Sequence, residues 1–100
     1  MITLNLQIKV KPGGREEFLE ALRVLFAQLA LEQSFVDAWV HTTEEDIDLI
    51  VVYERWKETK ESFIRDILPK PFFKPYLAVF EKLGVDRKAH WLDTRYAWRS

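Results

Sequence analysis

The chain has 100 residues, the size of one domain, and 48% of them are hydrophobic, so residues 1–100 can bury a core as a single unit. Lys and Arg number 15 and Asp and Glu 16, which leaves no basic excess for a nucleic acid partner. The absence of cysteine excludes disulfides, thiol catalysis and cysteine metal sites. No apolar run approaches the roughly 20 residues of a membrane helix, so we expect a cytoplasmic protein without a membrane partner.

A strand and a helix are the first elements predicted along the chain. From Ile2 to Val10, apolar and polar residues alternate, which indicates a strand with one buried face. The segment from Lys11 to Gly14 carries a strong turn signal and ends this strand. A helix is then expected from Arg15 to about Glu32, because leucine and phenylalanine residues recur there at helical spacing.

The strongest strand signal is the segment Ile47–Trp56. Its stretch from Leu49 to Tyr53 is an unbroken run of apolar and aromatic residues, typical of a central strand that is covered on both faces. Phe35–Thr43 alternates as another strand, and only the acidic turn at residues 44–46 separates the two. So short a link makes them antiparallel neighbours in the predicted sheet.

The last third of the chain predicts two helices and a final strand. Lys57–Leu68 is expected to be a short helix capped by Thr59. After a break at two prolines, a second helix is expected over Phe72–Leu83, ended by Gly84; because Pro75 fits only a first turn, its regular part is expected to begin near Lys74. Arg87–Trp98 alternates as the last strand, and its two partly apolar faces suggest contact with a second subunit.

The resulting order is β-α-β-β-α-β, which predicts an α+β ferredoxin-like fold with helices on one face of a four-stranded antiparallel sheet. The predicted central strand is too apolar to leave either face in water. We therefore expect a homodimer in which two sheets pack face to face.

Several segments resemble the antibiotic biosynthesis monooxygenase family. They are the strand end Val51–Trp56, the segment Pro71–Leu77, and the opening Ile8–Gly13 with Glu16, Glu17 and Phe18 after it. The resemblance extends over almost the whole chain and implies a dimeric α+β barrel. Family members include haem-degrading enzymes and monooxygenases that need no cofactor and oxidise polycyclic phenols or quinols. The helix Trp and His of the haem-degrading members are not matched here, so the resemblance implies no cofactor.

The resemblance also implies two catalytic residues. Trp56 matches a Trp that lies beside the substrate in the polyketide monooxygenases, and His41 matches a His near the end of the second strand. An Asn four residues before that Trp is replaced by Val52 here, and a His of the quinol-oxidising members is replaced by Pro71. These two departures leave the catalytic activity open.

Each candidate residue has a functional and a structural interpretation. His41 could take a phenolic proton near pH 7, or it could be a half-exposed residue at a strand end. Trp56 could orient a flat ring, or it could pack the sheet against the second helix. Tyr76 offers a hydroxyl to a ligand. The other residues expected to bind substrate are apolar and could equally form a filled core: Leu22, Phe26, Phe63 and Phe73. Two isolated histidines predict no metal site.

The family resemblance, together with these residues, implies two alternative functions. The first is a cofactor-independent monooxygenase that oxidises an electron-rich phenol or hydroquinone with dioxygen. The alternative is a non-catalytic dimer that binds or senses a small aromatic ligand on the same fold. A structural dimer with no cavity near Trp56 and Tyr76 is a third possibility.

Overall fold

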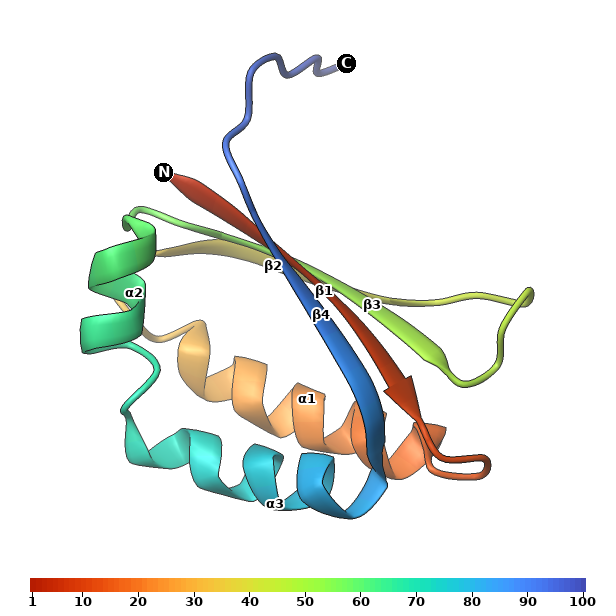
Figure 1. Ribbon diagram of the computed structural model, residues 1–100. Helices are drawn as coiled ribbons and strands as arrows, with labels where there is room; N and C mark the ends of the chain where they lie inside the picture. The colour runs from red at the N-terminus through yellow and green to blue at the C-terminus, as the bar shows by residue number, and fades with distance from the viewer.

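The computed structural model describes residues 1–100 and consists of a four-stranded antiparallel sheet with all its helices on one face (Figure 1). The strands, in the spatial order β2-β3-β1-β4, are β1 (Ile2–Val10), β2 (Phe35–Thr42), β3 (Leu49–Trp56) and β4 (Gly84–Leu92). The helices are α1 (Arg15–Leu29), α2 (Lys60–Asp66) and α3 (Lys74–Leu83), with a 3-10 turn η1 (Pro71–Phe73) before α3. The predicted α+β ferredoxin-like fold is therefore confirmed.

β1 and β3 form the centre of the sheet. In their antiparallel register, Ile8 lies opposite Ile50 and Leu6 lies opposite Val52. Because side chains alternate along a strand, the even-numbered residues of both strands face the helices. β3 is a central strand as predicted, but within one chain only its helix-facing side is covered, and Tyr53 on the other side is exposed.

The core lies between the sheet and the helices. α1 contributes one side chain per turn to it, at the spacing that the sequence predicts. These residues are Phe18, Leu22, Leu25 and Leu29. α1 ends at Leu29, earlier than expected, because residues 30–34 turn the chain towards β2.

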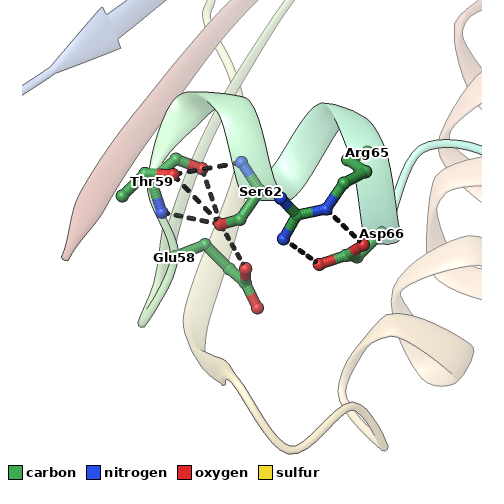
Figure 2. Close-up of polar contacts among 5 residues, drawn as sticks. All are labelled: Glu58, Thr59, Ser62, Arg65 and Asp66. Atoms are coloured by element: carbon green, nitrogen blue, oxygen red, sulfur yellow. Dashed lines mark hydrogen bonds and ion pairs between the residues drawn. The ribbon is translucent and has the colours of Figure 1, made fainter.

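A capping box starts α2 (Figure 2). Thr59 Oγ1 accepts a hydrogen bond from the Ser62 amide at 3.0 Å, and the Thr59 amide donates to Ser62 Oγ at 2.9 Å. The Ser62 hydroxyl also donates to the Glu58 carboxylate at 2.5 Å. The predicted cap at Thr59 is confirmed, and because its backbone is extended, the helix begins at Lys60 rather than Lys57.

The predicted bounds of the last strand are wrong at both ends. β4 begins at Gly84 and ends at Leu92, whereas alternation predicts Arg87–Trp98. Its last residue pairs with Thr3, and β1 itself begins one residue before Thr3, so the rest of the chain has no strand to pair with. Residues 93–100 leave the sheet as an extended tail (Figure 1).

Gly84 joins α3 directly to β4, with no intervening loop. Its backbone is extended, so it is not required for a left-handed conformation. A Cβ atom at this position would lie 2.6 Å from the Phe80 carbonyl oxygen and 2.7 Å from the Phe80 ring. Gly84 ends the helix as predicted, and glycine is needed there because a larger side chain would have no space at the junction.

We predict that Gly84→Ala lowers the free energy of unfolding by about 1–3 kcal/mol, the usual cost of overpacking. Urea unfolding followed by circular dichroism measures this. Truncating Phe80 in the same chain should not restore stability fully, because the closest atom belongs to the backbone. An unchanged unfolding midpoint for Gly84→Ala would contradict the prediction.

Candidate active site

An apolar cavity of about 320 Å³ lies between the sheet and the helices. This volume falls at the lower end of the range for ligand sites. Thirteen of its 15 lining residues are hydrophobic, and the two others are Glu54 and Arg87. The apolar lining includes all five residues that the sequence predicts to bind substrate: Leu22, Phe26, Phe63, Phe73 and Tyr76. An open cavity beside Tyr76 argues against a core that is simply filled.

Glu54 is the buried charged residue of this cavity. β3 places it on the helix-facing side of the sheet, opposite Leu4. Its Oε1 accepts a hydrogen bond from Trp56 Nε1 at 3.0 Å, and no cation pairs with it. Burial raises the pKa of Glu54 to about 7, although the Trp56 hydrogen bond opposes the shift. Such a carboxyl group can take or give a proton near neutral pH.

The second Glu54 oxygen is free to meet a ligand. It makes no hydrogen bond in the chain. Tyr76 Oη is the one fully buried side-chain polar atom that lacks a partner. Glu54 Oε2 also lacks a partner, so it cannot be fully buried and must border the cavity that Glu54 lines. One oxygen of this carboxylate is thus held in place by an indole, and the other faces the cavity.

Tyr76, on α3, brings a hydroxyl to the same cavity. Burial raises the pKa of the Tyr76 hydroxyl, and the nearby Arg87 guanidinium opposes this rise, although no hydrogen bond of regular geometry joins the two groups. The Glu54 charge raises the pKa of Tyr76 further. The Phe18 ring packs edge-on against the Tyr76 ring at 5.8 Å and fixes its position. A buried hydroxyl without a partner is rare in proteins, and a ligand in the cavity could supply one.

Trp56 is fully buried and does not line the cavity. Its ring lies between Phe35 and Phe63, with centroid distances of 5.1 and 5.2 Å. Its contact with the cavity is indirect, through the hydrogen bond to Glu54. The tryptophan that does line the cavity is Trp91 on β4, edge-on to Phe63 at 5.6 Å.

His41 lies on the opposite face of the sheet from the cavity. It pairs with Val51 in the β2–β3 register, and its exposed ring packs edge-on against Tyr53 at 6.4 Å. Trp56 and Glu54 point to the helix side. The structure therefore does not bring together His41 and Trp56, the two predicted catalytic residues, within one chain.

Sequence reasoning missed Glu54, Arg87 and Trp91 as cavity residues. Glu54 was open to detection, because it stands between Val52 and Trp56 on an otherwise apolar strand face. A lone carboxylate in such a position needs either a buried partner or a raised pKa. Arg87 and Trp91 carry no comparable signal, because both faces of the last predicted strand mix polar and apolar residues.

Two other kinds of feature are absent from residues 1–100. No group of three or more His, Asp or Glu side chains is arranged to hold a metal ion. None of the helices has the length and apolar character needed to cross a membrane.

Comparison with known proteins gives a family match over most of the chain. The family model described as antibiotic biosynthesis monooxygenase matches residues 1–65. No curated protein matches the sequence.

Solved structures share the fold at low sequence identity. SnoaB, a cofactor-independent oxygenase from Streptomyces nogalater, is 18% identical with a TM-score of 0.83, covering 99% of this chain and 97% of that chain. A putative antibiotic biosynthesis monooxygenase from Nitrosomonas europaea is 20% identical with a TM-score of 0.82, covering 96% and 100%. PA3566 from Pseudomonas aeruginosa is 24% identical with a TM-score of 0.81, covering 96% and 94%. At these identities the structures establish the fold alone.

We predict that Glu54 makes the protein less stable as the pH rises from about 4.5 to about 7. In this window the unfolded chain releases the Glu54 proton while the folded chain keeps it. Stability is therefore greatest below the window and falls by about 3 kcal/mol across it. Glu54→Gln should remove this slope in urea unfolding measured at a series of pH values.

The matched control for this measurement is Glu45→Gln, in the exposed turn between β2 and β3, which should keep the wild-type slope. Equal slopes for Glu54→Gln and the wild type would show that the Glu54 carboxyl is not desolvated.

Proposed function

Because the chain belongs to the antibiotic biosynthesis monooxygenase family, we propose that it is a cofactor-independent monooxygenase that oxidises an electron-rich phenol or hydroquinone with dioxygen. Family membership supports a monooxygenase-type function. The observation that carries the proposal is Glu54, a carboxyl group with a pKa of about 7 in an apolar cavity. SnoaB, which shares the fold, is itself a cofactor-independent oxygenase.

In this proposal Glu54 is the general base. Oε2 takes the proton of a bound phenol, while the Trp56 indole holds Oε1. An apolar cavity alone would disfavour the phenolate, so the anion needs a hydrogen-bond donor. The buried Tyr76 hydroxyl, which lacks a partner in the chain, supplies that donor.

The phenolate is the electron donor in the next step. It passes one electron to dioxygen, which gives a phenoxyl radical and superoxide, and their combination forms a carbon–oxygen bond on the ring. Glu54 returns its proton to the resulting peroxide, and loss of water, which takes the hydrogen of the same ring carbon, gives a quinone. One oxygen atom enters the ring and the other leaves as water, so the substrate supplies all four electrons. The apolar walls exclude water from the peroxide.

His41 is the competing candidate for the base, and its role remains a prediction from the family resemblance. A base must come within hydrogen-bond reach of the proton that it removes. His41 faces away from the cavity on β2, whereas Glu54 lines it. This geometry favours Glu54.

We predict that Glu54→Gln lowers kcat for an accepted hydroquinone by roughly 10²- to 10⁴-fold, the usual contribution of a general base. His41→Ala should leave kcat near the wild-type value. An oxygen electrode with a panel of hydroquinones measures both variants.

The reverse pattern, an active Glu54→Gln variant and an inactive His41→Ala variant, would assign the base to His41. Tight binding of aromatic compounds by the wild type without any oxygen uptake would favour the ligand-binding or sensing dimer instead.

We also propose that a second copy of the chain covers the free face of the sheet. The large aromatic side chains of Trp39 and Tyr53 lie exposed on this face. Beside them, Arg55 forms a two-pronged ion pair with Asp37, and its guanidinium lies over the Trp39 ring at 5.8 Å. Aromatic and arginine side chains are enriched at protein interfaces.

We predict that the wild type is a dimer by light scattering and that Trp39→Glu shifts it towards monomer, because a charge would be buried at the interface. Leu31→Glu, at an exposed apolar residue outside the sheet, should stay dimeric. A wild type that is monomeric at all concentrations would refute the dimer.

A further inference from the structure

Arg87 is the only arginine in a helix or strand that has no carboxylate partner. β4 places it opposite Ile8, on the side of the sheet that faces the helices. Its guanidinium lies over the Phe80 ring at 5.0 Å, a contact that positions the charge without neutralising it. The other arginines in helices and strands each form an ion pair with a carboxylate: Arg15, Arg23, Arg55 and Arg65.

The polar groups of the cavity are arranged by depth. Glu54 and Tyr76 are buried, whereas Arg87 is exposed on the edge strand and lines the same cavity. Glu54 does not form an ion pair with Arg87, so the positive charge of the guanidinium is not neutralised by this carboxylate. The cavity therefore has a proton acceptor inside and, near the Tyr76 hydroxyl, a cation that no carboxylate of the chain neutralises.

We propose that the substrate is a phenol or hydroquinone of one or two rings that carries a carboxylate, which Arg87 binds while the ring hydroxyl meets Glu54 and Tyr76. This inference rests on the proposed function, since it names the substrate class for the same cavity. A guanidinium can hold a carboxylate through two parallel hydrogen bonds. The cavity volume of about 320 Å³ limits the number of rings.

The test compares two small hydroquinones, gentisate and its methyl ester, which has no negative charge and one additional methyl group. Isothermal titration calorimetry under nitrogen measures binding without turnover. The wild type should bind gentisate more tightly than the ester, and Arg87→Met should weaken gentisate binding roughly 10- to 100-fold while leaving ester binding unchanged. The ester also reports whether the variant has kept its cavity. Lys88→Met is the matched control, because Lys88 pairs with Gln7 on the other face of the sheet.

Equal binding of the acid and the ester by the wild type, or binding of neither, overturns the inference. An Arg87→Met variant that binds gentisate as tightly as the wild type overturns it as well. Measuring oxygen uptake with both compounds distinguishes failure of this inference from failure of the proposed oxygenase function. Preference for the acid without uptake supports the ligand class and refutes the oxygenase, whereas uptake with both compounds at equal affinity supports the oxygenase and refutes the role of Arg87.

Discussion

The register between β1 and β3 is the constraint on which the rest of the molecule depends. Pairing Leu4 with Glu54 and Ile2 with Trp56 puts both β3 side chains on the helix side of the sheet. A slip by one residue would turn the whole apolar set to the other face and bring Tyr53 into the core. The pairing that buries the apolar side chains therefore also places the Glu54 carboxylate at the cavity.

Two carboxylates on neighbouring strands show how the two faces of one sheet differ chemically. On the free face, hydrogen bonds from Arg55 hold the pKa of Asp37 below its usual range. On the helix face, Glu54 has only the indole of Trp56 as a partner, and burial raises its pKa. A charge that is not needed for structure is normally paired or kept in water. Glu54 is an exception to this rule, because it is buried and has no cation as a partner.

Residue periodicity predicted most of the fold, because β1 and α1 each have a single buried face with a regular spacing. It could not predict where β4 ends, since residues 93–98 also alternate and only the start of β1 limits the pairing. The cavity residues on the helices, such as Leu22 and Tyr76, were predictable because they belong to the same regularly spaced apolar faces as the core. The face on which His41 lies was not predictable, because a family position near a strand end does not fix the face of the sheet. In β2, an irregularity between Phe35 and Asp37 puts His41 on the free face.

The junction at Gly84 has a mechanical consequence. α3 carries Tyr76 and β4 carries Arg87, and no loop between these elements can absorb a displacement. The Leu83 carbonyl also accepts a hydrogen bond from the Lys11 amide at 2.8 Å, which anchors the junction to the end of β1. The direct connection and this hydrogen bond therefore fix how α3 and β4 are joined. An insertion of one residue here would turn Arg87 to the other face of the sheet, away from the cavity, whereas a change at a wall side chain such as Leu68 would leave this spacing intact.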